Sequence, residues 1–220
     1  MHLYESILAK AKWNRKDNIV IVFSEKGIRG RKVLEQEDSI RNIQIRFKSY
    51  GNAIIIHEKT RFTNAKILLG ERNIVFIEES KDVLQNLTID AKNSGGTTLS
   101  IDKNFLCSGC YFKLKEGKRI TIGRDCMFSF DIAIWNSDCH AIFKDGECIN
   151  KGEDVIIGNR VWIGHGVEIL KGTLISDDSV VAARTLVNKK FLTPNCIIAG
   201  IPGKIINQNI SWDRRSPAKF

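Results

Sequence analysis

The sequence predicts an all-β fold, a single-stranded parallel β-helix in which short strands wind into stacked triangular coils. The first observation is a six-residue hydrophobic period that begins at Ile157 and continues through six consecutive units. The second is a series of short β-branched segments upstream of it, separated by polar turns. The third is the lack of a Pro- or Ser-rich linker, so the 220 residues are expected to form one continuous body.

The hexads read IGNRVW, IGHGVE, ILKGTL, ISDDSV, VAARTL and VNKKFL, and each opens with Ile or Val. A helix repeats every 3.6 residues and a simple strand every 2, so neither explains a period of six. Three hexads fit one triangular coil, in which every sixth side chain points inward. Stacked coils then bury a continuous aliphatic column, while parallel strands form hydrogen bonds between coils. Because one coil cannot bury its own inner face, several must stack.

The same count runs upstream through Ile122, Phe128 and Ile134, and His140 falls on its next place. The polar, turn-rich run FKDGECINKGED then interrupts the period. We therefore expect His140 to end one run of coils, at the root of an excursion loop formed by residues 143–154.

Four segments are predicted along the chain. Residues 1–17 include a short helix, because Leu3, Ile7, Leu8 and Ala11 fit one helical face. Irregular coils are expected over 18–117, regular hexapeptide coils over 118–206, and a C-terminal tail over 207–220. All three prolines lie near the C-terminus, where the solenoid should end.

The composition narrows the classes of partner. Formal net charge is +9, which favours anionic partners. The basic residues are scattered and no nucleic-acid motif accompanies them, so no nucleic-acid binding is expected. The start of the chain lacks the apolar core of a signal peptide, and no apolar run nears the roughly 20 residues of a membrane helix, so a cytoplasmic location is expected.

The cysteines do not predict a metal site. In a reducing compartment all six are expected to be thiols. Cys107 and Cys110 form a lone CxxC pair, with no second pair to complete the four ligands of a zinc site. Small packing residues are the simpler interpretation.

The hexads VIIGNRVWIGHGVEILKG, the following SVVAARTLVNKKF and NCIIAGIPGKII resemble the hexapeptide-repeat acyltransferases. That family forms left-handed parallel β-helices, and the hand is expected here only from this resemblance. The similarity is greatest to the branch that O-acetylates capsule and O-antigen polysaccharides. In that branch a D-x-H element precedes a loop, as Asp138-Cys139-His140 does, and a W-x-R-like tail resembles Trp212-Asp213-Arg214. The strong part of the match covers residues 118–214.

The resemblance implies transfer of an acetyl group from acetyl-CoA to a sugar hydroxyl, directly in a ternary complex. His140 is the expected general base, because histidine is the residue type whose unperturbed pKa, about 6.5, suits the acceptance of a hydroxyl proton at neutral pH. Asp138 is expected to orient or polarise the imidazole, or to contact the acceptor. Strand alternation is expected to place the side chains of residues 138 and 140 on one face, where they can come into contact.

The resemblance also implies a coenzyme A groove between two subunits of a homotrimer. The positions that match the family's cofactor site are Trp162, Ala183, Asn188, Lys189 and Lys204. No metal is expected, because Leu170 stands where a second histidine would accompany His165 in a zinc enzyme of the same fold. The family's glycan acceptors also allow a peripheral association with membrane-bound glycan assembly machinery, at the inner face of the membrane.

Two other functions fit the same sequence. The acceptor could be the amine of a nucleotide-linked amino sugar, which makes the protein an N-acetyltransferase. Alternatively, the solenoid could be a non-catalytic scaffold or glycan-binding module. Acceptors with free amines separate the first from O-acetylation, and the behaviour of a His140→Ala variant separates the second.

Overall fold

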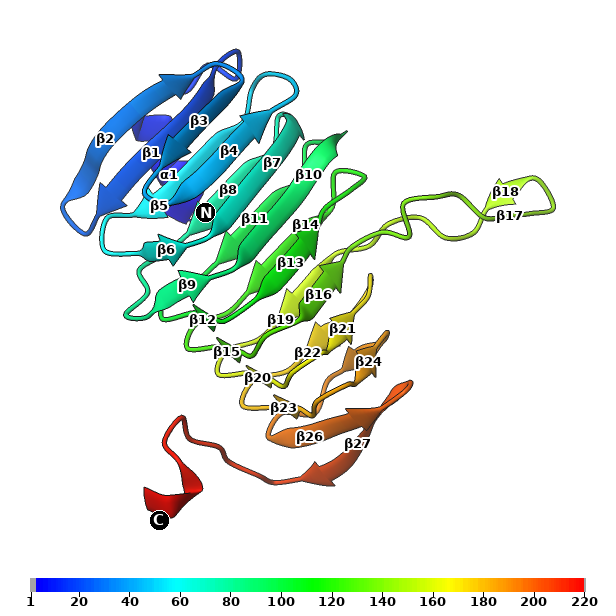
Figure 1. Ribbon diagram of the computed structural model, residues 1–220. Coiled ribbons are helices and arrows are strands. Elements are labelled where there is room, and N and C mark those ends of the chain that lie inside the picture. The colour runs from blue at the N-terminus through cyan, green and yellow to red at the C-terminus, as the bar shows by residue number, and fades with distance from the viewer. Residues whose placement is uncertain (1–2, 220) are drawn as a thin grey trace.

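The computed structural model describes residues 3–219 and shows a left-handed parallel β-helix of about seven turns, with one short α-helix at its N-terminal end (Figure 1). Helix α1 spans Leu3–Lys10 and is shorter than the predicted segment, because the backbone turns at Lys12 and Arg15, which both have positive φ. Residues 1 and 2 of that segment lie outside the described residues. A 3-10 turn, η1, spans Pro217–Lys219.

Three sheets form the faces of the prism, and each list below gives strands in spatial order. The first face contains β2 (Gly27–Leu34), β1 (Asn18–Ser24), β5 (Ala53–His57), β8 (Ile74–Ile77), β11 (Thr98–Ile101), β14 (Arg119–Ile122), β19 (Val155–Ile157), β22 (Leu174–Ile175) and β25 (Lys190–Phe191). The second face contains β24 (Leu186–Val187), β21 (Glu168–Ile169), β16 (Ile132–Trp135), β13 (Cys110–Lys113), β10 (Leu87–Gly95), β7 (Ala65–Glu71), β4 (Ile43–Phe47) and β3 (Glu37–Ile40).

The third face contains β12 (Leu106–Cys107), β15 (Met127–Phe128), β20 (Trp162–Ile163), β23 (Val180–Val181), β26 (Cys196–Gly200) and β27 (Gly203–Gln208). Beside it, β6 (Arg61–Thr63) pairs with β9 (Val83–Gln85). The two remaining strands, β17 (Phe143–Lys144) and β18 (Glu147–Cys148), form a hairpin outside the prism (Figure 1).

The hexad prediction is confirmed by the register of the regular coils. Ile157 pairs with Ile175, and Ile163 pairs with Val181, each one 18-residue coil further along the chain. The residues that open the six hexads are all at most 1% exposed. They form one hydrophobic column, because parallel stacking brings every inward residue above its equivalent in the next coil.

Coils nearer the N-terminus are longer, which explains why the six-residue period fades there. Ile101 pairs with Ile122, 21 residues later, and Val75 pairs with Leu99, 24 residues later. The extra residues lengthen the strands and turns, whereas the inward side chains stay buried in the same core cluster. Coil length changes gradually along the chain. The domain boundary expected at residue 117 therefore stays a prediction.

Both ends of the prism are covered. At the N-terminal end, β2 and β3 pair antiparallel with β1 and β4. Helix α1 packs Tyr4 and Ile7 against the outer side of the first face, in a small apolar cluster with β1, β5 and β8. At the C-terminal end, β27 folds back antiparallel on β26. The tail then returns along the body, where Arg214 donates hydrogen bonds to the carbonyls of Asn104 and Cys126. Covered ends reduce exposed strand edges that would invite pairing with other chains.

One corner of the prism has a buried polar ladder. We call it the asparagine corner; there the chain passes from the second to the first face, through residues 48–52, 72–73, 96–97, 114–118, 136–154, 170–173 and 188–189. The side-chain oxygen of Asn18 accepts from the Asn52 side-chain amide (2.8 Å), that of Asn52 from the Asn73 backbone amide (3.0 Å), and that of Asn73 from the Thr97 amide (3.0 Å). These groups are buried, and their hydrogen bonds fix the shape of the corner.

Candidate functional site

A long excursion leaves the asparagine corner between β16 and β19 and projects from the prism as an extended arm (Figure 1). It begins directly after Trp135 and returns at Val155, so it starts earlier than the predicted residue 143. His140 lies on this arm and is exposed, and therefore does not occupy the next inward place of the six-residue count. The neighbouring Cys139 has a φ of 66°, a turn that a regular strand cannot contain.

Glu116 holds the two ends of the excursion together at its root. One carboxylate oxygen accepts a hydrogen bond from the Ser137 hydroxyl, and the other accepts one from the Gly152 amide at 2.7 Å. A Cβ at Gly152 would lie 3.0 Å from the Asn136 carbonyl and 3.1 Å from the Glu116 carboxylate, so this contact favours glycine. The Ser137 hydroxyl, followed by the Gly152 amide, holds the pKa of the Glu116 carboxyl below its ordinary value.

Glu116→Gln is expected to loosen this root, because a neutral amide cannot accept two strong charge-assisted hydrogen bonds. The pKa of Glu116 is lower in the folded protein than in the unfolded chain, so its carboxylate stabilises the fold. This stabilisation is complete above the pKa of the unfolded state and is lost as pH falls through the pKa of the folded state. At neutral pH the protection factor of the Gly152 amide, which is its intrinsic exchange rate divided by its observed rate, should be about 5- to 30-fold lower in the variant. In the wild type the same protection factor should fall as pH drops through the folded-state pKa of Glu116.

Glu153→Gln is the matched control, because it removes one carboxylate charge from the residue next to Gly152. It should leave exchange at Gly152 unchanged, because the Glu153 contact to the root is made by its backbone amide, which donates to the Asn136 carbonyl at 3.0 Å. Equal acceleration in both variants would show that the Glu116 carboxylate does not fix the root.

Asn150 positions the backbone around His140. Its side-chain amide donates to the His140 carbonyl at 2.9 Å, and its side-chain oxygen accepts from the Ile142 amide at 2.7 Å. The two legs of the arm are thereby joined next to the histidine. The backbone is held while the imidazole itself stays exposed, which is the arrangement a base needs to reach a substrate.

Asp138 lies beside this segment and bonds to a lysine of the next coil. Its carboxylate accepts hydrogen bonds from Lys171 Nζ and from the Asn150 side-chain amide, the latter at 2.9 Å. The hydrogen bond from Lys171 is the main reason that the pKa of Asp138 lies below its ordinary value; burial opposes this shift, and the hydrogen bond from Asn150 adds to it. The expectation that strand alternation aligns Asp138 with His140 is wrong, because residues 136–142 are not a strand. Asp138 instead accepts a hydrogen bond from the Asn150 side-chain amide, which also donates to the His140 carbonyl.

The five residues matched to a cofactor site lie in three places. Asn188 and Lys189 lie on the asparagine corner, two coils beyond the excursion, and Lys189 Nζ lies 5.4 Å from the Phe191 ring centroid. Ala183 is exposed at the corner between the third and second faces.

Trp162 and Lys204 lie on the third face. Trp162 is 37% exposed and its ring centroid lies 6.1 Å from that of Trp212 in the tail. Lys204 is exposed on β27, opposite Ala199. Within one chain these residues are on a different side of the prism from His140. The third face and its margins also expose apolar side chains, at Leu192, Ile201 and Ile206.

Three residues of this site were missed in the sequence: Glu116, Asn150 and Lys171. Glu116 and Lys171 lie in turns whose composition is typical of any solvated corner, and Asn150 lies in a polar loop. Their contacts join positions 10 to 36 residues apart. No local pattern predicts which of these turns meet, since that depends on the lengths of the intervening coils.

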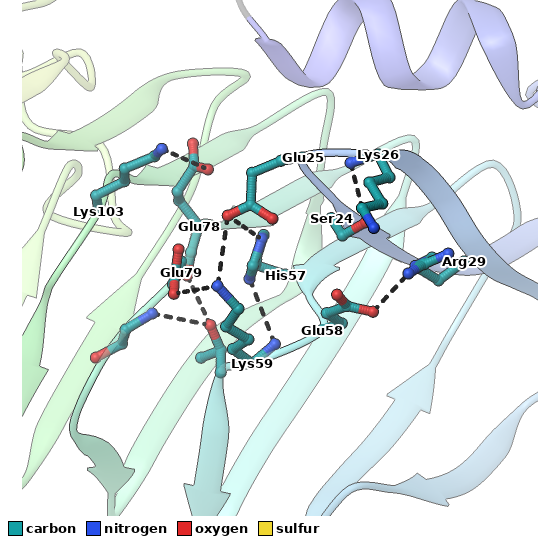
Figure 2. Close-up of polar contacts among 12 residues, drawn as sticks. Ser24, Glu25, Lys26, Arg29, His57, Glu58, Lys59, Glu78, Glu79 and Lys103 are labelled. Atoms are coloured by element: carbon teal, nitrogen blue, oxygen red, sulfur yellow. Dashed lines mark hydrogen bonds and ion pairs between the residues drawn. The ribbon is translucent and has the colours of Figure 1, made fainter.

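A second polar cluster lies on the first face, away from the excursion. Glu25, His57 and Glu79 each offer a ligand atom, all within 4.8 Å of one another. Figure 2 shows the Lys59 side chain beside both carboxylates, with its ammonium 3.6 Å from Glu25 and 3.0 Å from Glu79. His57 Nδ1 accepts a hydrogen bond from the Lys59 amide, so in neutral His57 the proton is on Nε2, facing Glu25. An internal cation therefore balances this cluster, and we assign no metal to it.

The left-handed β-helix with a projecting arm, taken with the relatives described next, places the chain in one class of enzyme, the β-helical acyltransferases. No family model matches the chain. Among curated proteins it is 34% identical, over 88% of its length and 90% of the relative's, to the polysialic acid O-acetyltransferase of Neisseria meningitidis. The chain belongs to the hexapeptide-repeat acetyltransferase family, in the branch of the capsule and O-antigen O-acetyltransferases, and it is an acyltransferase enzyme.

Solved structures show the same relationship. The polySia-specific acetyltransferase NeuO superposes with a TM-score of 0.75 at 27% identity, covering 93% of this chain and 88% of that one. The polysialic acid O-acetyltransferase OatWY superposes with a TM-score of 0.55 at 31% identity, covering 80% of this chain and 79% of that one. In residues 3–219 no helix is both long enough and apolar enough to cross a bilayer.

Proposed function

We propose that this enzyme transfers an acetyl group from acetyl-CoA to a hydroxyl of an acidic bacterial surface polysaccharide, with a polysialic acid-type chain as the first acceptor to test. The observation that carries the proposal is the 34% identity, over nearly the full length of both chains, with a polysialic acid O-acetyltransferase. A formal net charge of +9 is favourable for binding a polymer that carries a carboxylate on each sugar.

His140 serves as the general base of a direct transfer. Its imidazole removes the proton from the acceptor hydroxyl as the oxygen attacks the thioester carbonyl. The tetrahedral intermediate collapses with breakage of the carbon–sulfur bond, and the imidazolium returns the proton to the departing CoA sulfur. The acyl group passes from one substrate to the other in a ternary complex, without an acyl-enzyme. Asp138 orients the segment through Asn150 and Lys171.

Coenzyme A binds between subunits of a homotrimer in this proposal. Trp162, Ala183 and Lys204 lie on a different side of the prism from His140, so a neighbouring subunit's His140 arm would complete the site. In this proposal Ala183 and Lys204 come from one subunit, whereas Asn188 and Lys189 come, like the His140 arm, from the asparagine corner of its neighbour. Lys189 and Lys204 supply positive charge for the nucleotide phosphates, and Asn188 and Ala183 flank the pantetheine arm. Exposed Ile201 and Ile206 supply apolar area for the subunit contact.

We propose that the enzyme works in the cytoplasm and associates peripherally with glycan assembly machinery at the inner face of the membrane. The positive charge of the chain is compatible with an anionic membrane surface.

The test is CoA thiol release from acetyl-CoA with three acceptors: polysialic acid, a neutral polysaccharide and a nucleotide-linked amino sugar. Release is expected with polysialic acid, and the product should carry base-labile acetyl esters detected by mass spectrometry. Release with the amino sugar and a base-stable amide product would establish the N-acetyltransferase alternative. Binding of polysaccharide with no release from any acceptor would establish the non-catalytic alternative.

A further inference from the structure

A cavity of about 410 Å³ lies at the N-terminal end of the asparagine corner, several coils from the His140 arm. Its lining consists of Trp13, Arg15, Arg72, Ile74, Gly95 and Gly96. The cavity thus combines an indole ring, two guanidinium groups and exposed glycine backbone. Nothing in the acetyl-transfer mechanism uses these residues.

The indole and the nearer guanidinium are placed together. Trp13 Nε1 donates to the Asp17 carbonyl at 3.1 Å, which fixes the ring plane. The Arg15 Cζ atom lies 5.8 Å from the Trp13 ring centroid. Arg15 has a φ of 59°, and its carbonyl packs so closely on Gly51 that a Cβ there would lie 2.6 Å away. The backbone contact sets the direction from which Arg15 reaches the cavity.

Arg72 comes from the next turn of the same corner. Its backbone amide donates to the Tyr50 carbonyl at 3.0 Å, and its Nε pairs with Glu71 at 2.9 Å. The Arg72 side chain is 61% exposed despite that pair. Beneath both arginines, the buried Asn52–Asn73–Thr97 ladder holds successive coils in register. The spacing between the two guanidinium-bearing turns is therefore set before any ligand binds, which lowers the entropy cost of binding.

Basic side chains continue from this cavity toward the excursion. Lys48 Nζ donates to the Asn93 side-chain oxygen at 3.0 Å, and Lys115 Nζ donates to the Asn93 carbonyl at 3.1 Å. Nearby carboxylates are already engaged: Asp90 pairs with Lys113 at 2.7 Å, and Glu116 holds the excursion root. The corner turns between the cavity and the arm, residues 48–52, 72–73, 96–97 and 114–118, contain four basic side chains and one acidic side chain, Glu116. This part of the corner is therefore predominantly positive.

The distance along this corner suits a polymer and not a single sugar. Arg72 and the His140 arm belong to corner turns three coils apart. At about 4.8 Å between neighbouring strands, three coils correspond to roughly 14 Å, before the arm's own projection is counted. A ligand that contacts both must be an extended chain of several sugar residues.

We propose that the Trp13–Arg15–Arg72 cavity is a remote subsite for a carboxylate-bearing sugar of the same acceptor chain whose hydroxyl is presented to His140. This inference rests on the proposed function. Guanidinium groups recognise a carboxylate through paired N–H donors, and the indole face packs against the apolar face of a sugar ring. Engagement at two places on one polymer raises affinity for long acceptors over short ones.

The first experiment compares acetyl transfer by the wild type and an Arg15→Gln/Arg72→Gln variant, using long polysialic acid and its short oligomers. The variant should raise KM for the long polymer about 10-fold, leave kcat unchanged and leave KM for short oligomers unchanged. Arg29→Gln/Arg31→Gln on β2 makes the same charge change outside the cavity and should leave both KM values unchanged. Unchanged KM for the long polymer, or equal rises in both variants, would overturn the subsite.

The second experiment measures binding without turnover. Long polysialic acid is titrated into the otherwise wild-type His140→Ala protein and into the same protein carrying Arg15→Gln/Arg72→Gln, by calorimetry and without acetyl-CoA. About 10-fold weaker binding in the latter supports the subsite, even if no acceptor is ever acetylated and the proposed function fails. A polymer whose carboxylates are reduced to alcohols should bind both proteins equally. A difference that persists with this neutral polymer would contradict carboxylate recognition.

Discussion

Replacing His140 with alanine is expected to lower the rate of acetyl transfer by about 10²- to 10⁴-fold, the usual contribution of a positioned general base. The imidazole is exposed on the excursion, and the contacts that hold this segment, from Asn150 to the His140 carbonyl and from Glu116 to Ser137, do not involve the ring. The substitution should therefore leave the fold and CoA binding unchanged. Thiol release at saturating acetyl-CoA and acceptor measures the loss.

Lys144→Ala is the matched control, because it also removes a polar, exposed side chain from the same arm, four residues away in β17. Its rate should stay within about threefold of the wild type, an allowance for small shifts of the arm. Near-wild-type turnover by the His140→Ala protein would assign the proton transfer to another group. A variant that loses CoA binding together with turnover would indicate that the ring contributes to the cofactor site.

Ile134→Ala is expected to have the largest effect on stability, lowering the free energy of unfolding by about 2–5 kcal/mol. Ile134 is fully buried in β16 and stacks between Phe112 of the previous coil and Ile169 of the next. Neighbouring coils are held in place by their strand hydrogen bonds, so the cavity left by the deleted atoms cannot collapse fully. Denaturant unfolding followed by circular dichroism measures the change.

Ile149→Ala removes the same atoms from an exposed position of the arm, where the side chain is 59% exposed. Its free energy of unfolding should change by less than about 0.5 kcal/mol, as expected for a surface substitution. If the Ile134 variant were as stable as this control, the stacked column would not be the main source of stability in the regular coils.

The regular half of the fold could be predicted because its six-residue period consists of apolar side chains that must be buried. Each of Ile157, Ile163 and Ile169 occupies an inward position that only an apolar residue fills at low cost, so the coil length is visible in the sequence. The longer N-terminal coils obey the same burial rule at spacings of 21 to 24 residues. That change of length removes the periodic signal without changing the architecture.

The site could be predicted only in its single residues. The resemblance predicts His140, and its role stays a prediction. Its position on the arm differs from the six-residue count because the turn at Cys139 leaves the coil. A hydrophobic period contains no information on backbone dihedral angles, so it cannot predict where the chain leaves the solenoid. The partners Glu116 and Lys171 depend on which turns are stacked, and this is known only when every coil length is known.

The arm is inserted without changing the register in which the coils on either side of it pair. Ile122 pairs with Ile157, Phe128 with Ile163 and Ile134 with Ile169, so all three faces resume the same alignment after the chain returns. The two ends of the insertion are clasped by Glu116. The segment that carries His140 is consequently a cassette: its tip can vary in length and composition while the stacked core stays the same. Changes at the tip therefore need not cost packing free energy in the core.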